Sequence, residues 1–325
     1  MEKMNQKQKV FECDLHCHTN RSDGNLPLKD VIDMAVSRGV KVLAVTDHDV
    51  IPAEYVMTEK GRVKTKDYAA KKKICVIPGI EVSCDTYVDD VHMIGLDCDW
   101  NHPFFKELQE MVVAGKMECN RKLVEVLQKD GFSISWDEVL YNEGSPVKPE
   151  NVQKKKIFEL LARKGYVRTW QDAKLMVQNN PEYNIRREKP DPVKVISKIH
   201  EAGGITILAH PYLIRSQIEK NGRRMDRFTY IDRLVDAGLD GIEGNYTYDK
   251  TSYAGNLTKE EIERQVRERY EGRLSFISGG SDYHADEVKG VKNARMQGEC
   301  GISLAYFDQH IRGFLKSFKE RGIDQ

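Results

Sequence analysis

The sequence lacks the features that define several large classes of protein. It has no uncharged apolar stretch of about 18 residues, which a membrane-spanning helix needs. Its seven cysteines form no CxxC pair and no zinc-finger spacing, so free thiols in a reducing compartment are expected. Residues 1–9 are polar and lack the apolar core of a secretory signal. These absences predict a soluble, cytoplasmic protein with no membrane partner.

A net charge is also absent, because 51 Lys and Arg residues balance 51 Asp and Glu residues. No global electric field therefore draws the protein to nucleic acid, although a local basic patch is still possible in such a chain. No internal repeat, low-complexity tract or sign of an obligatory protein partner is present. The 325 residues can form one barrel-sized domain, or a barrel with an insertion.

Apolar runs typical of β-strands alternate with helical patterns in both the first and the last third of the chain. The expected strands are Val10–Leu15, Lys41–Val45, Ile74–Ile77, Val91–Leu96, Ile205–Ala209, Gly241–Gly244 and Leu274–Ser278. The expected helices between them include Leu28–Ser37, Pro192–Ala202 and Phe228–Ala237, each closed by a glycine suited to a C-cap. Strands separated by helices predict an α/β fold with a parallel sheet, and seven strands are enough for a closed barrel.

The middle of the chain, from about Asn101 to Lys189, contains only helical patterns and most of the lysine and arginine runs. The expected helices are Phe104–Lys129, Trp136–Tyr141, Asn151–Lys164 and Trp170–Asn179. We predict a helical insertion between the fourth and fifth barrel strands. The domain organisation is then barrel (1–99), insertion (100–190) and barrel (191–325).

The first expected strand ends in an HxH pair, His16 and His18. Side chains two residues apart in a strand share a face, so both imidazoles can chelate one metal ion while Cys17 points into the core. The alternative is a pair of surface histidines without a ligand.

Other residues that can bind metals fall on or directly after further strands. They are His48, Glu81, His92, His210, Asp282 and His284. Each has an ordinary structural alternative, as a core histidine or a carboxylate in a turn, but their common placement favours one site at one end of a barrel. Gly279 and Gly280 would let the backbone approach that site closely.

Six motifs in order complete this pattern: DLHCHTNRSDG, AVTDHD, PGIEVS, a strand histidine, LAHP and GGSDYH. With them the chain resembles the PHP (polymerase and histidinol phosphatase) family over residues 11–98 and 192–285. In detail it is similar to the branch that contains nucleoside 3′,5′-bisphosphate phosphatases and a 5′-to-3′ exoribonuclease. The resemblance implies a distorted seven-stranded (β/α) barrel of PHP type with a substrate-capping helical insertion.

The resemblance also implies two or three divalent metal ions. It places the first on His16, His18, Glu81 and Asp282, the second on Glu81, His92 and His210, and the third on Asp23, His48 and His284. Asp23 lies in Ser-Asp-Gly, which is also a good turn sequence. Glu81, Asp282 and His284 are the expected catalytic residues, while Asp14, Asp47 and Glu243 could orient the imidazoles.

The mixed imidazole and carboxylate ligands suit manganese, iron or zinc better than magnesium or calcium, and the resemblance favours manganese. The predicted reaction is hydrolysis of a phosphomonoester by metal-activated hydroxide, with in-line attack on phosphorus and no covalent nucleophile.

Substrate-binding residues are expected in the insertion. Arg121 matches an arginine that contacts phosphate in the similar branch, and Arg187 is a further candidate. Lys156 ends a lysine run where that branch commonly has Arg-Pro-His, which leaves the nucleotide substrate open. For all three the alternative is a solvated basic helix face.

Three activities are compatible with this pattern. The leading one is a phosphatase for a small phosphorylated substrate such as a nucleoside 3′,5′-bisphosphate. The second is a 5′-to-3′ exonuclease on short RNA or DNA, which would need stacking aromatics beside its cations. The third is a C–N hydrolase of the amidohydrolase class, whose barrels also begin with HxH, but Asp23 and the Asp282–His284 pair fit the phosphoesterase pattern better.

Overall fold

A computed structural model describes residues 10–142, 145–148, 152–220 and 222–319. The polar residues 1–9, which we expect to carry no secretory signal, lie outside the described residues, as does Asn151, the expected start of one helix. The chain divides into two compact units, one made of residues 1–105 and 190–325 and the other of residues 106–189.

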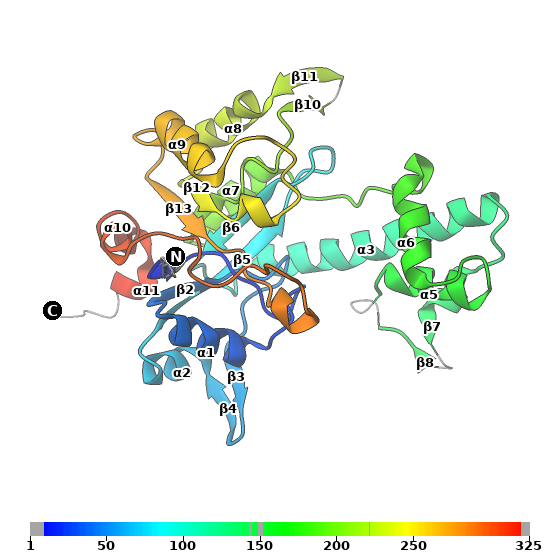
Figure 1. Cartoon of the computed structure of the whole chain (residues 1–325), viewed down its shortest axis with the longest axis horizontal. Helices are drawn as coiled ribbons and strands as arrows, with labels where there is room; N and C mark the ends of the chain where they lie inside the picture. The colour runs from blue at the N-terminus through cyan, green and yellow to red at the C-terminus, as the bar shows by residue number, and fades with distance from the viewer. Residues whose placement is uncertain (1–9, 143–144, 149–151, 221, 320–325) are drawn as a thin grey trace, which may run out of the picture. The chain divides into compact units, whose positions relative to one another are not determined.

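The first unit is built on a seven-stranded sheet, as predicted (Figure 1). In spatial order its strands are β1 (Cys13–Asp14), β2 (Val42–Val45), β5 (Cys75–Ser83), β6 (His92–Leu96), β9 (Ile205–Leu208), β12 (Gly241–Tyr246) and β13 (Phe276–Gly280). The first and last strands meet where Leu15 N donates to Gly279 O at 3.2 Å and Cys17 forms a bridge with Tyr283. These contacts nearly close the sheet into a barrel.

The predicted parallel arrangement holds for the other neighbouring strands but fails at β6, which runs antiparallel to both β5 and β9. A parallel pair needs a long crossover, usually a helix, whereas only the short segment 84–91 connects β5 to β6. This reversal places His92, at the start of β6, at the same end of the barrel as the carboxyl ends of the other strands.

Helices and hairpins surround the sheet. The helices of this unit are α1 (Leu28–Arg38), α2 (Thr65–Lys71), α7 (Pro192–Glu201), α8 (Arg227–Asp236), α9 (Lys259–Tyr270), α10 (Leu304–His310) and α11 (Lys316–Lys319). Two hairpins that the sequence did not predict are β3 (Tyr55–Thr58) with β4 (Gly61–Lys64), and β10 (Gln217–Lys220) with β11 (Arg223–Asp226). The expected C-cap at Gly39 is confirmed by its left-handed conformation, with φ of 87°.

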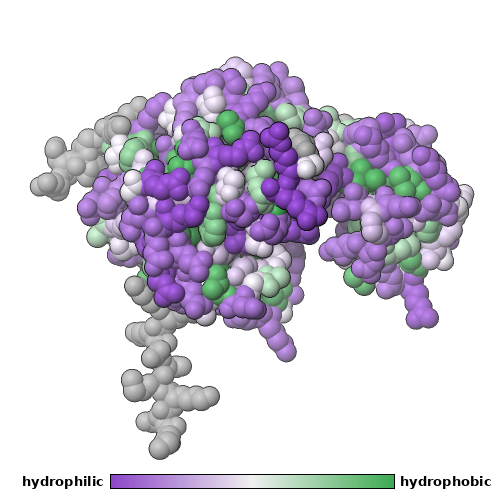
Figure 2. Space-filling view, turned by 90° about the horizontal axis from the view of Figure 1, so that it is seen from above, coloured by the Kyte–Doolittle hydropathy of each residue, from purple (hydrophilic) through white to green (hydrophobic). Residues whose placement is uncertain are grey.

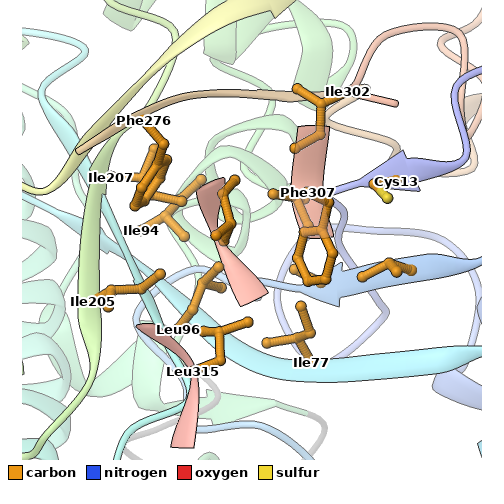
Figure 3. Packing of buried hydrophobic residues seen from close by; sticks show 14 of the residues in the cluster. Cys13, Ile77, Ile94, Leu96, Ile205, Ile207, Phe276, Ile302, Phe307 and Leu315 are labelled. Atoms are coloured by element: carbon orange, nitrogen blue, oxygen red, sulfur yellow. The ribbon is translucent and has the colours of Figure 1, made fainter. Parts of the chain in front are cut away.

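Apolar side chains fill the barrel at the end opposite the predicted site (Figure 3). Cys13, Ile205 and Phe276 enter this core from the amino-terminal ends of their strands. Phe307, on α10, is fully buried among them and packs with Ile302. The barrel is therefore a packed core rather than a pore, and only its other end is free for chemistry.

The second unit contains most of α3 (Pro103–Lys129) together with α4 (Trp136–Leu140), α5 (Lys155–Arg163) and α6 (Trp170–Asn179). It also contains a short antiparallel ladder that the sequence did not predict, between β7 (Tyr141–Asn142) and β8 (Ser145–Pro146). Its own apolar core includes Leu123, Leu127, Ile157 and Leu161, all fully buried.

Within the described part of the chain, no helix is long and apolar enough to span a membrane. The face of the molecule shown in Figure 2 is largely hydrophilic, with hydrophobic residues in small scattered groups.

Candidate metal centre

The structure brings all nine predicted metal ligands to one end of the barrel. His16 and His18 follow β1, His48 follows β2, and Glu81 lies within β5. Asp23 lies in the turn that follows His18, and the remaining ligands come from the start of β6 and from the segments after β9 and β13. Backbone hydrogen bonds hold these segments together, since His18 N donates to Tyr283 O at 2.8 Å and Asp282 N donates to His16 O at 2.8 Å.

The first group consists of His16, His18, Glu81 and Asp282, all buried. His16 Nε2 lies 3.1 Å from both His18 Nε2 and Glu81 Oε2, and 3.3 Å from Asp282 Oδ1. His18 Nε2 lies 3.1 Å from Glu81 Oε2 and 3.0 Å from Asp282 Oδ1. Four ligands at roughly 2.1 Å from one ion would lie about 3.0–3.4 Å apart, so these atoms are spaced as ligands of a single metal.

The protonation of this group also fits a metal. His16 Nδ1 lies 3.0 Å from Glu243 Oε1, which can only accept, so the hydrogen of a neutral His16 ring belongs on Nδ1. His16 Nε2 then presents a lone pair toward two carboxylate oxygens and a second imidazole nitrogen. Buried acceptor atoms this close repel one another unless a cation or protons lie between them.

Glu81 is shared with a second set of atoms. His92 Nδ1 and His210 Nε2 lie 2.9 and 3.1 Å from Glu81 Oε1, while His48 Nδ1 lies 3.2 Å from Glu81 Oε2. His48, Glu81 and His92 together could hold an ion. His48 Nδ1 is buried without a hydrogen-bond partner, which is consistent with a metal ligand.

A third set gathers around Asp23, whose side chain is half exposed. His284 Nε2 lies 3.2 Å from Asp23 Oδ1, and His48 Nε2 lies 3.8 Å from Asp23 Oδ2. His18 joins this set through Nδ1, 3.6 Å from Asp23 Oδ1, although the sequence placed His18 only on the first ion. The three sets thus share Glu81 and two histidines.

The electrostatics are those of a site that needs cations. Burial opposes charge on Glu81, but the neighbouring His48, His16 and His92 hold its pKa well below the usual range. Burial also opposes charge on His18, but hydrogen bonds to Asp282 and Glu81 outweigh it and raise the pKa of His18 to about 9. Burial lowers the pKa of His48 to about 4. Perturbed pKa values of this kind are typical of functional sites.

Backbone strain marks two of the candidate ligands. His210 has φ of 30° and Asp282 has φ of 50°, in the left-handed region that residues other than glycine rarely adopt. Such strain persists only where surrounding contacts fix the conformation, and it concentrates at functional sites.

Three predictions concerned residues that orient the imidazoles, and two of them are wrong. Glu243 does accept from His16, as expected. Asp14 instead accepts from Ser281 N at 2.9 Å, Ser281 Oγ and Gly298 N, and Asp47 accepts from Thr19 N at 2.8 Å and Ser22 Oγ. These two carboxylates fix the loops that carry the ligands, because loop N–H groups need acceptors.

A cleft of about 390 Å³ opens beside the three sets. Among its lining residues that the sequence did not predict are Tyr246, Lys250 and Arg295. Tyr246 ends β12, so the rule that strand ends carry the site could have found it. Arg295 lies in a segment without regular structure, and no sequence signal distinguishes it.

The three predicted substrate residues, Arg121, Lys156 and Arg187, all lie in the helical unit. Arg121 forms ion pairs on its own helix, 2.9 Å from Glu118 and 3.0 Å from Glu125. Lys156 is partly exposed near the start of α5, and the Arg187 side chain passes close to Gly115.

An α/β barrel with clustered histidines and carboxylates at one end defines a class of metal-dependent hydrolases, and comparison with known proteins identifies the family. The PHP domain model matches residues 14–184, more than half of the chain. The chain therefore belongs to the PHP domain family, and with it to the metal-dependent phosphoesterases. His210, Asp282 and His284 lie beyond the matched residues.

The individual relatives share less than a third of their residues with this chain. The chain is 27% identical to a 3′,5′-nucleoside bisphosphate phosphatase of Chromobacterium violaceum over 84% of this chain and 87% of that protein. It is 29% identical to a 5′-3′ exoribonuclease of Haemophilus influenzae over 61% of this chain and 68% of that protein. A solved structure from Bifidobacterium adolescentis, described as a metal-dependent phosphoesterase, matches with a TM-score of 0.62 at 24% identity, covering 98% of this chain and 99% of that one. This structural match supports the fold alone.

Proposed function

We propose that this protein is a phosphatase that hydrolyses a phosphomonoester of a small metabolite, with a nucleoside 3′,5′-bisphosphate as the leading substrate. One observation carries the proposal: three sets of ligand atoms overlap through Glu81, His18 and His48 beside an open cleft. Adjacent divalent ions, when bound, supply activated hydroxide at neutral pH and charge stabilisation for a phosphoryl group.

The residues of the chain divide the remaining work. His16, His18, Glu81 and Asp282 would hold one ion, and Glu243 keeps the ring of His16 turned toward the other three side chains. Asp282 and His284, on the segment after β13, face the cleft together with Glu81, and we assign catalysis to these three. Imidazole with carboxylate favours manganese, with iron or zinc as alternative occupants.

A small substrate is favoured by the size of the cleft, since 390 Å³ lies within the range of small-molecule sites. The bisphosphate phosphatase also aligns with more of this chain than the exoribonuclease does. The second candidate, a 5′-to-3′ exonuclease acting on short RNA or DNA, is favoured by the higher identity to the exoribonuclease.

We further propose that the helical unit, residues 100–190 in the predicted organisation, caps the substrate. Arg121, Lys156 and Arg187 would contact its phosphates, because an arginine fork suits a second, non-reacting phosphate. The seven cysteines, which all lie in the described part of the chain, form no disulfide, which is consistent with the proposed cytoplasmic location.

The test is a direct comparison of substrates with manganese-loaded protein. We would assay p-nitrophenyl phosphate, nucleoside 3′,5′-bisphosphates, histidinol phosphate, 5′-phosphorylated short RNA and an N-acyl substrate. Phosphate release from the bisphosphate at the highest kcat/KM would support the proposal. Mononucleotides released only from RNA would favour the exonuclease, and no phosphate release by a metal-loaded protein would refute the phosphatase.

A matched pair of variants tests the site itself. His16→Ala should lose both metal and turnover, because it removes a ligand of the central ion. His310→Ala is the control, because His310 lies on α10 and belongs to none of the three sets of ligands. Its ring stacks on Tyr306, with the centroids 4.4 Å apart. Full turnover in His16→Ala, or an equal loss in His310→Ala, would contradict the assignment.

A further inference from the structure

The two carboxylate oxygens of Asp282 have different surroundings. Oδ1 faces the central set of ligands, 3.3 Å from His16 Nε2 and 3.0 Å from His18 Nε2. Oδ2 accepts a hydrogen bond from Tyr246 OH at 2.6 Å and a second, charge-assisted one from Arg295 Nη1. Oδ1 is therefore directed to the candidate metal ligands, whereas Oδ2 accepts both hydrogen bonds.

Tyr246 is suited to hold a side chain in place. It is 1% exposed, at the carboxyl end of β12, and its ring lies beside those of His16 and His210, with centroids 6.3 and 5.4 Å apart. A buried tyrosine packed against two rings has little room to change rotamer. Since a carboxylate can only accept, the phenol must be the donor.

Arg295 is held as firmly. Its side chain is 16% exposed, and Nη2 lies 3.6 Å from Asp286 Oδ2 and 3.1 Å from His284 Nδ1. His284 Nδ1 is also 2.8 Å from the carbonyl oxygen of Asp282 and can donate to it, so the arginine contact with this ring is one of packing. The strong partner of Arg295 is Asp282.

We propose that Tyr246 and Arg295 are positioning residues that fix Asp282 so that Oδ1 alone is presented to the metal centre. The inference rests on the metal centre described above. Without the two donors, the carboxylate could rotate and offer both oxygens, or turn Oδ1 away from the histidines. The positive φ of Asp282 makes its observed backbone conformation costly unless contacts hold the residue in place.

Metal affinity is the primary test, measured by competition between the purified protein and a chelator for Mn²⁺. Tyr246→Phe removes one hydroxyl and keeps the ring, so we expect affinity at the Asp282 site to fall roughly tenfold, within the range known for partners of metal ligands. Arg295→Met should lower it at least as much, and Arg295→Lys should restore part of the loss.

Tyr248→Phe is the matched control. Tyr248 is also buried on the barrel, but its hydroxyl accepts from Tyr212 N at 3.2 Å and, among the described residues, forms no hydrogen bond with a candidate metal ligand. The metal-free Tm of Tyr246→Phe and Tyr248→Phe should fall by similar amounts, while only Tyr246→Phe loses metal affinity. Unchanged affinity in Tyr246→Phe, or an equal loss in Tyr248→Phe, overturns the proposal.

A kinetic measurement separates positioning from substrate binding by Arg295. At saturating Mn²⁺ we expect Arg295→Lys to lower kcat with KM unchanged. A raised KM with unchanged metal affinity would make Arg295 a substrate ligand and overturn its positioning role. Because metal affinity is measured without an ester, a wild-type protein that binds Mn²⁺ but hydrolyses nothing would refute the proposed function and leave this inference testable.

Discussion

At the scale of single residues, the centre is an arrangement of acceptors that need positive charge. The Nε2 atoms of His16 and His18 lie within hydrogen-bond distance of each other, of Glu81 Oε2 and of Asp282 Oδ1. Neutral histidines and ionised carboxylates cannot satisfy all of these contacts with protons. In the metal-free protein the rings therefore bind protons. A metal ion must displace these protons, because it coordinates through the same lone pairs.

Metal affinity should consequently rise with pH. Burial opposes charge on His18, but its bonds to Asp282 and Glu81 raise its pKa to about 9, and the pKa of His16 is shifted in the same direction. Below pH 9 an Mn²⁺ ion that binds His18 displaces its proton, so affinity for that ion should increase about tenfold per pH unit over this range. Calorimetry at pH 6.5, 7.5 and 8.5, in two buffers with different heats of ionisation, measures the proton release. Affinity independent of pH would contradict this protonation.

The ligands could be predicted from sequence because each stands at a strand end, where side-chain direction and barrel geometry together determine position. The contacts of Asp14 and Asp47 could not be predicted, since a buried carboxylate near a strand end can serve either an imidazole or a loop N–H group. Arg295 could not be predicted either, because it reaches Asp282 from an irregular segment. The pairing of such a segment depends on tertiary packing alone.

At the scale of elements, the sequence did not predict the direction of strand β6. An apolar run such as Val91–Leu96 reads the same in a parallel and in an antiparallel strand, and only the short 84–91 connection distinguishes them. The helices α1 and α7 were predicted nearly to the residue because caps and apolar periodicity agree there. The hairpins were missed because their strands are four residues long and only partly buried, so they lack the apolar runs typical of strands.

The contact between β13 and the segment after β1 should tolerate no side chain at Gly280. A Cβ atom there would lie 2.4 Å from His16 Cβ and 2.7 Å from His16 N. Gly280→Ala should therefore lower the free energy of unfolding by roughly 1–3 kcal/mol and reduce metal content, because His16 must move. Urea denaturation and metal analysis measure the two effects. Gly313→Ala is the control, since a Cβ there meets nothing within 4 Å; an equal effect of both variants would contradict the role of Gly280.

At the scale of the whole molecule, the ligand set lies in the barrel unit and the proposed substrate residues in the helical unit. Chemistry and recognition would then be separable by mutation. Arg121 is the residue on which to test this. Its pairs with Glu118 and Glu125 are exposed, and surface pairs of this kind contribute little energy, so a phosphate can replace them.

Arg121→Ala should raise KM for a nucleoside 3′,5′-bisphosphate and lower kcat/KM roughly tenfold or more, with metal content unchanged. The KM for p-nitrophenyl phosphate, which has no second phosphate, should stay the same. Lys122→Ala serves as the control, because Lys122 is an exposed neighbour on α3 that also pairs with Glu118. Equal changes for both substrates, or for both variants, would show that Arg121 belongs to a solvated helix face.

Removal of metal should destabilise the barrel unit and leave the helical unit unaffected, because every candidate ligand belongs to the barrel unit. An ion present at 100 times its Kd adds about 2.7 kcal/mol to the stability of the folded state. A chelator should therefore lower the Tm of the barrel transition by roughly 5–10 °C, and excess Mn²⁺ should restore it. Scanning calorimetry with and without chelator measures the shift, and Asp282→Asn should reduce it because one ligand is weakened. If the chelator leaves the Tm of the barrel transition unchanged, or shifts only the Tm of the helical unit, the result would contradict a metal centre in the barrel.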